Sequence, residues 1–126
     1  MTIIGHPWIA SIKFSRVRSK DAIEHTASGS ILLFEKLDKD IDLILYSQKE
    51  NLPFAIKITT IEEAIFAHNL NARYIFVEKN MAKEIQEIAQ HYLFDTQIVA
   101  EIESQDEITT YVKLGLDGVV FPSAIE

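Results

Sequence analysis

The stretch "PFAIKIT", from Pro53 to Thr59, carries an alternation that separates two possible folds. Side chains point alternately to the two faces of a strand, so one face of this stretch is apolar and the other turns polar toward its C-terminal end. The faces hold Phe54, Ile56 and Ile58 on one side and Ala55, Lys57 and Thr59 on the other. A strand covered on both faces in an open doubly wound sheet is nearly continuously apolar. One-sided polarity is typical of a barrel wall, which is apolar under its helices and polar at the inner mouth.

Six β-rich runs alternate with helical patterns along the chain. The runs cover Trp8–Phe14, Ser30–Lys36, Pro53–Thr59, Arg73–Lys79, Gln97–Glu103 and Gly118–Ala124. Helices are predicted over residues 38–50, 59–70, 80–93 and 104–115, with a short one over 19–27. Thr60 with Glu63, and Ser104 with Glu107, have the spacing of capping boxes. Trp8 is expected to pack at the start of the first run. Strand–helix alternation of this kind predicts a parallel sheet with right-handed crossovers.

Polar residues near the ends of these runs recur at a constant step. Lys13, Glu35, Lys57, Lys79 and Glu101 follow one another at intervals of 22 residues, and Ser123 continues the series. A constant step predicts strand–helix units of equal length that are equivalent in space. We therefore expect one α/β domain over residues 1–126, with six parallel βα units in the order 1-2-3-4-5-6, like a truncated TIM barrel. The alternative is an open flavodoxin-like doubly wound sheet, with strand order 2-1-3-4-5.

The C-terminal ends of parallel strands meet at one edge, where barrels and open sheets bind their ligands. A barrel layer is built from alternate strands, so Lys13, Lys57 and Glu101 are expected to meet near one mouth. The binding residues predicted there are Lys13, Glu35, Lys79 and Ser123, with Lys57 and Glu101 as the catalytic pair if the protein is an enzyme. A non-functional alternative stays open, in which Lys57 and Glu101 form only a structural ion pair. A buried charge without a partner is costly, so Lys57 is either paired or solvated.

Composition excludes several classes of function. Twelve basic residues against nineteen acidic ones give a net charge of −7, which argues against a nucleic-acid partner. The absence of cysteine excludes disulfides and thiolate chemistry, and no metal-type spacing or glycine-rich loop suggests a metal or another cofactor. The N-terminus is unlike a signal peptide, and no apolar run is long enough for a membrane span. A cytoplasmic protein is expected.

Residues 59–124, from "TTIEEAIFAHNLNARYIFVEKN" through "IVAEIESQDEITTYVKLGLDGVVFPSA", resemble a family of aldolases. These are the 2-keto-3-deoxy-6-phosphogluconate / 4-hydroxy-2-oxoglutarate aldolases, which have "EA…AGA.YIVSP" and then "P…G..TP.E…A…GAD.VKFFPA". The resemblance implies a β/α barrel of the phosphate-sugar kind. The family's Schiff-base lysine, just before the Phe of its sixth strand, corresponds to Val120. Glu78–Lys79 stands where the family has Ser-Pro, and the family's phosphate-binding strands seven and eight have no counterpart.

The sequence leads to two hypotheses for the function. The first is a non-catalytic module, related to phosphate-sugar β/α barrels, that binds a small anionic metabolite or a protein. A homodimer or higher homo-oligomer is expected, because the first and last of six strands would be open edges, near residues 8–14 and 118–124. The alternative is a Schiff-base lyase or aldolase with Lys57 as a relocated amine and Glu101 as proton shuttle. We favour the first, because Glu101 would hold Lys57 in its charged form.

Overall fold

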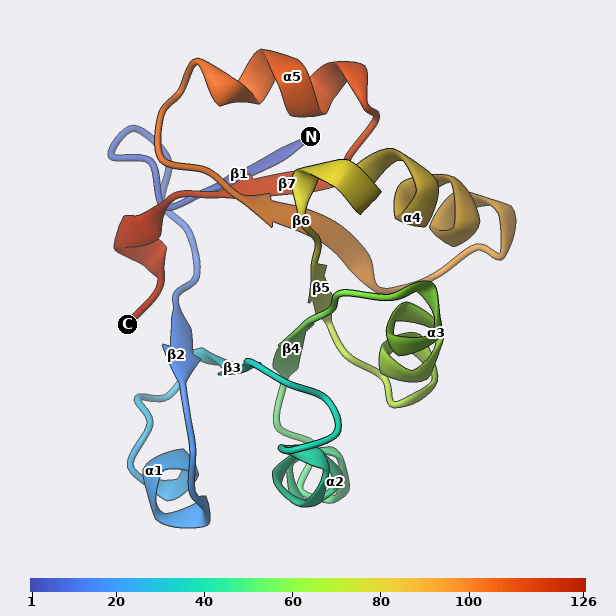
Figure 1. Cartoon of the computed structure of the whole chain (residues 1–126). Helices are drawn as coiled ribbons and strands as arrows, with labels where there is room; N and C mark the ends of the chain where they lie inside the picture. The colour runs from blue at the N-terminus through green and yellow to red at the C-terminus, as the bar shows by residue number, and fades with distance from the viewer.

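The structure, a computed structural model, describes all residues from 1 to 126 and has an α/β fold (Figure 1). Its strands are β1 (Thr2–Ile4), β2 (Phe14–Arg16), β3 (Ile31–Phe34), β4 (Phe54–Lys57), β5 (Tyr74–Phe76), β6 (Gln97–Glu101) and β7 (Gly118–Val120). Its helices are α1 (Lys20–Glu24), α2 (Ile41–Lys49), α3 (Ile61–Asn69), α4 (Lys79–His91) and α5 (Glu107–Lys113), followed by the short 3₁₀ helix η1 (Pro122–Ala124). None of the helices combines the length and the apolar character that crossing a bilayer requires.

All seven strands are parallel and form one sheet in the order β1-β7-β6-β5-β4-β3-β2. The sheet curls into a half-barrel with the helices on its outer side (Figure 1). From β2 to β7 the order is sequential, as the barrel prediction requires, and the flavodoxin-like alternative with order 2-1-3-4-5 is wrong. The predicted number of six strands is also wrong, because β1 adds a seventh beside β7.

The N-terminal segment accounts for the missing strand. The prediction of a strand over Trp8–Phe14 is wrong: regular pairing begins only at Phe14, and residues 8–13 form none. The strand β1 lies earlier and pairs Thr2 with Gly118, far away in the sequence. Trp8 is 86% exposed instead of packing at a strand start. The chain turns directly after β1, at Gly5, which has a φ of 92°.

The sheet register shows that the 22-residue step is not a spatial repeat. Leu33 pairs with Ala55, which is a step of 22 residues, but Lys57 pairs with Phe76 and Phe76 with Val99. The spatial counterpart of Lys57 on the next strand is therefore Phe76. Lys79, predicted at the end of that strand, is the first residue of α4.

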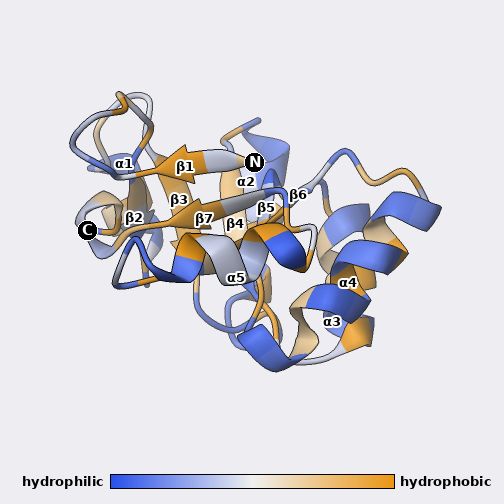
Figure 2. Cartoon of the chain, turned by 90° about the horizontal axis from the view of Figure 1, so that it is seen from above, coloured by the Kyte–Doolittle hydropathy of each residue, from blue (hydrophilic) through white to orange (hydrophobic).

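Two apolar clusters lie on opposite faces of the sheet. The larger one contains Phe54, Ile56 and Ile58 and lies between the sheet and the helices. The smaller one fills the concave side and contains Ala55, as the alternation in "PFAIKIT" predicts. Figure 2 shows the apolar colours gathered on the strands and the polar colours on the helices. The inner face therefore carries a compact core at its middle and charged residues at the C-terminal ends of its strands.

The edges expected to be open are paired within the chain. The strand β1 covers β7, and Ile125 forms a parallel bridge with Phe14 of β2. The amide of Glu126 donates to the carbonyl of Phe14 at 2.8 Å, and the amide of Arg16 donates to the carbonyl of Glu126 at 3.1 Å. The argument from open edges at residues 8–14 and 118–124 therefore does not hold. A homo-oligomer stays a prediction without that support.

Candidate functional site

A pocket of about 450 Å³ lies at the C-terminal ends of the central strands. Its lining consists of Glu35, Lys57, Ile58, Thr59, Phe76, Val77, Glu78, Lys79, Glu101 and Tyr111. These residues come from the ends of β4, β5 and β6, from the residue after β3, and from the helices α4 and α5. The volume is within the range of small-molecule sites, and the place is where parallel α/β sheets bind ligands.

A chain of alternating charges crosses the inner mouth beside this pocket. Arg16 Nε lies 2.9 Å from Glu35 Oε1, and Glu35 Oε2 lies 3.1 Å from Lys57 Nζ. Lys57 Nζ also lies 3.8 Å from Glu101 Oε1. The four side chains are between 31% and 41% exposed, so none of these charges is isolated in the core. Lys57 is therefore both paired and partly solvated, and its contact with Glu35 is shorter than the predicted contact with Glu101.

Of the two carboxylates in this row of charges, Glu35 has the shorter contacts with its cationic partners. Its partial burial by itself would raise the pKa. Hydrogen bonds and charge attraction from Lys57 and then Arg16 outweigh that effect, so the pKa of Glu35 lies below its usual value. The carboxylate is thus ionised at neutral pH and stabilises both cations.

The structure brings together four of the six predicted site residues: Glu35, Lys57, Lys79 and Glu101 all line the pocket. The remaining two lie elsewhere. Lys13 precedes β2 instead of ending it, and its Nζ pairs with Glu126 Oε1 at 3.2 Å. Ser123 lies in η1, where its hydroxyl donates to the carbonyl of Gly5 at 2.6 Å. Lys13 and Ser123 therefore do not line the pocket.

Sequence reasoning missed Arg16, which occupies the position expected for Lys13. The sequence does contain a pattern that predicts Arg16. In "FSR", the sequence of β2, an inward-facing residue is followed two positions later by a charged one, as Ala55 is followed by Lys57 in β4. Phe14 belongs to the inner cluster, so Arg16 lies on the same face one step nearer the mouth. Tyr111 and Glu78 were also missed. Their positions depend on how α5 and α4 pack, which no local pattern shows.

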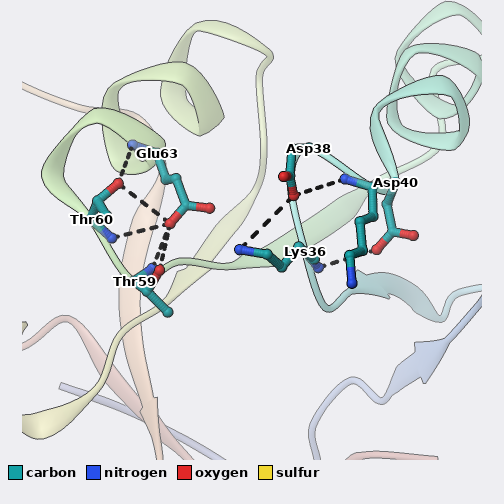
Figure 3. A network of polar contacts seen from close by, with 7 residues as sticks. Lys36, Asp38, Asp40, Thr59, Thr60 and Glu63 are labelled. Atoms are coloured by element: carbon teal, nitrogen blue, oxygen red, sulfur yellow. Dashed lines mark hydrogen bonds and ion pairs between the residues drawn. The ribbon is translucent and has the colours of Figure 1, made fainter.

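Helix caps fix the loops around the pocket (Figure 3). Glu63 Oε1 accepts hydrogen bonds from the amides of Thr59 and Thr60, at 2.9 and 3.1 Å, and the Thr60 hydroxyl accepts from the Glu63 amide at 3.2 Å. The capping box predicted for Thr60 and Glu63 is thereby confirmed, whereas the one predicted for Ser104 and Glu107 is wrong, because α5 starts at Glu107 after Asp106 and has no side-chain cap. After β3, the amide of Lys36 donates to Asp40 at 3.1 Å. The strand ends that carry Lys57 and Glu35 are therefore followed by well-anchored turns.

The start of α4 differs from this pattern. Like α2 and α5 it has no side-chain cap, but unlike them it also has no acidic residue in its first turn. The amides of Lys79 and Asn80 donate to no acceptor within the chain. At the start of α5, in contrast, Glu107 accepts hydrogen bonds from the amides of Glu103 and Ser104 at 2.8 and 3.0 Å. Free amides at a helix start attract anions, and Lys79, the first residue of α4, lines the pocket. No group of three or more acidic or histidine side chains is arranged to hold a metal ion.

Replacing Lys57 by Met is expected to lower the free energy of unfolding by about 1–2 kcal/mol at pH 7, between the values for exposed and for buried ion pairs. The change leaves Glu35 and Glu101 without their shared partner. Because the folded pKa of Glu35 is below the usual 4.5, the stabilisation is complete above about pH 4.5 and is lost as the pH falls through that lowered pKa. Urea melts at several pH values measure this.

A double-mutant cycle supplies the control for this prediction. The coupling of Lys57→Met with Glu35→Gln should exceed its coupling with Glu101→Gln, since the contact is 3.1 Å in one case and 3.8 Å in the other. An effect of Lys57→Met that is the same at pH 7 and pH 2 would show that packing, and not charge, causes the loss.

No protein-family model matches the chain, and a search of curated proteins finds no matching relative. The resemblance of residues 59–124 to the aldolases therefore stays a prediction. At the position of the family's Schiff-base lysine, Val120 is fully buried in the inner cluster at the end of β7. Whatever this pocket does, it does without a lysine on that strand.

Proposed function

We propose that the chain is a non-catalytic module that binds a small anionic metabolite in the pocket at the C-terminal ends of β4–β6. The observation that carries this proposal is the uncapped start of α4, with two free amides and Lys79 at the pocket. Amides at a helix start and a neighbouring ammonium group attract a carboxylate or phosphate together. A relation to phosphate-sugar barrels rests on the sequence resemblance alone.

Binding of a protein at this site is the less favoured form of the same proposal. The charged groups line a concave pocket of about 450 Å³, which suits a small molecule better than a flat protein surface. The anchored turns after β3 and β4 also support a preformed pocket, because little ordering is needed when a ligand enters.

A Schiff-base lyase or aldolase is the second candidate, and the place of Lys57 favours it. Lys57 lies in the pocket beside a carboxylate, Glu101, that has the right chemistry for proton transfer. Against this, a Schiff base needs a free amine, and Lys57 Nζ is engaged by two carboxylates, 3.1 Å from Glu35 and 3.8 Å from Glu101. Borohydride treatment in the presence of pyruvate is expected to leave the mass unchanged. An adduct on Lys57 would establish the lyase reading instead.

The proposal that the pocket binds an anion is tested by removing the positive charge of Lys79 at the start of α4. Isothermal titration with inorganic phosphate, acetate, pyruvate and glycerol phosphate should show binding of at least one of these anions. We expect Lys79→Gln to raise its Kd about tenfold, equivalent to about 1.4 kcal/mol, because the ligand loses an ion pair. Added salt should weaken binding as well, since the site is partly exposed.

Lys83→Gln is the matched control for Lys79→Gln. Lys83 is exposed on the same helix and does not line the pocket, so its replacement changes the net charge equally. Its effect on the Kd is expected to be less than twofold. Equal effects of the two substitutions, or no binding of any of the four anions at 10 mM of each probe, would refute the proposal.

A further inference from the structure

The lining of the pocket carries carboxylates as well as ammonium groups. Three carboxylates, from Glu35, Glu78 and Glu101, face two ammonium groups, from Lys57 and Lys79. Glu35 is already satisfied by Arg16 and Lys57. An anionic ligand would therefore bind more tightly if it also carried a cationic group for the two further carboxylates, Glu78 and Glu101.

Those two carboxylates have acceptor capacity to spare. Glu101 has one contact, of 3.8 Å, with Lys57, which is longer than a hydrogen bond. Glu78 forms no ion pair, and its side chain does not cap the helix that follows it. Each ionised carboxylate can accept several hydrogen bonds. Glu78 has no ion-pair partner and Glu101 has only its long contact with Lys57, so both can accept hydrogen bonds from a ligand.

Tyr111 provides an independent sign of a ligand. Its side chain lines the pocket, the residue is only 5% exposed, and its hydroxyl makes no hydrogen bond with another residue of the chain. Burial and then the charge of Glu107 raise the pKa of this hydroxyl, so it keeps its proton at neutral pH. The hydroxyl is therefore free to donate a hydrogen bond to an oxygen of a ligand in the pocket.

The pocket lining also contains apolar side chains. Ile58, Phe76 and Val77 belong to the pocket lining and are all buried. They can contact the carbon skeleton of a ligand whose two ends are charged. A cationic end and an anionic end in one small molecule would match the lining, whereas either end alone would match half of it.

We infer that the ligand is a small zwitterion of the amino-acid kind. Its carboxylate binds the free amides at the start of α4, Lys79 and the hydroxyl of Tyr111, and its ammonium group binds Glu101 and Glu78. This inference rests on the proposed function of the same pocket and specifies the chemical class of its ligand. In this arrangement the carboxylate and the ammonium group of the ligand each have a partner of complementary charge or hydrogen-bonding type, and no chemical reaction is involved.

The test measures binding of the twenty common L-amino acids, one at a time, by isothermal titration. The tightest binder is then compared with the two molecules that lack its amino group or its carboxylate. The intact amino acid is expected to bind at least tenfold more tightly than either of them. Glu101→Gln should weaken binding of the amino acid and leave the deaminated acid bound at least as tightly as before, so that the preference is lost, whereas Lys79→Gln should weaken both.

Glu84→Gln, on the exposed surface of α4 and away from the pocket, is the control and should change no Kd by more than twofold. Should Glu101→Gln fail to fold, as judged by circular dichroism, Glu78→Gln replaces it with the same expected loss of preference. A deaminated acid that binds as tightly as the amino acid would overturn the zwitterion and leave the proposed function standing. If neither the amino acids nor the simple anions bind, both fall together.

Discussion

Replacing Phe14 by alanine is expected to lower the free energy of unfolding by about 3–5 kcal/mol, the usual loss for a buried aromatic residue. Phe14 is fully buried and belongs to the inner cluster of nine residues. Its ring meets those of Tyr74 and Phe76 edge to face, with centroids 5.3 and 5.1 Å apart. Parallel strands hold these residues in place, so the neighbours can only partly fill the space that is left.

Chemical denaturation followed by circular dichroism measures this loss, and Phe66→Ala is its control. Phe66 lies on α3 and is 62% exposed, so its replacement is expected to change the stability by less than about 0.5 kcal/mol. Equal losses for Phe14→Ala and Phe66→Ala would contradict an inner core on the concave side of the sheet.

Replacing Gly5 by alanine is expected to lower the stability by about 2–4 kcal/mol, the sum of backbone strain and overpacking. Gly5 has a φ of 92°, which an L side chain rarely adopts. A Cβ atom there would also lie 2.9 Å from the Cβ of Ala124 and 3.2 Å from the Cβ and the carbonyl oxygen of Phe121. Ala124 and Phe121 both belong to the segment after β7, where β1 ends against η1.

Gly29 offers a control in which only the strain applies. Its φ of 88° is nearly the same, but a Cβ there would have no neighbour within 4 Å. Gly29→Ala is therefore expected to lose about 1–2 kcal/mol in the same melts. The difference between the two variants reports the contact of β1 with the C-terminal segment. If both lose the same, that contact is absent and the seventh strand is in doubt.

The sequence predicts the faces of the strands better than it predicts their partners. Alternation in "PFAIKIT" depends only on neighbouring residues, and it correctly assigns Ile56 outward and Ala55 inward. The capping box of Thr60 and Glu63 is local in the same way and is confirmed. The strand β1, in contrast, has three residues and pairs with β7 at the other end of the chain. No local pattern specifies such a pairing.

The candidate site shows the same limit. Lys57 and Glu101 are correctly placed at one mouth, because both end inward-facing strand positions. The constant 22-residue step, however, ignores that the loops and helices between strands differ in length. The 22-residue step therefore selects Lys13, which precedes β2, although Arg16 is the residue of this strand that lies at the mouth. It also selects Lys79, which reaches the pocket from a helix start and not from a strand end.

The most direct test of the binding pocket is an amide NMR titration of the intact chain with the tightest-binding amino acid. The account predicts the largest shift changes at the free amides of Lys79 and Asn80, with further changes near Glu101 and Tyr111. The amide of Gly29, which is not part of the pocket lining, should not move. Largest changes around Asn71 and Arg73, which line a different pocket of about 190 Å³, would contradict the account, as would the absence of any change.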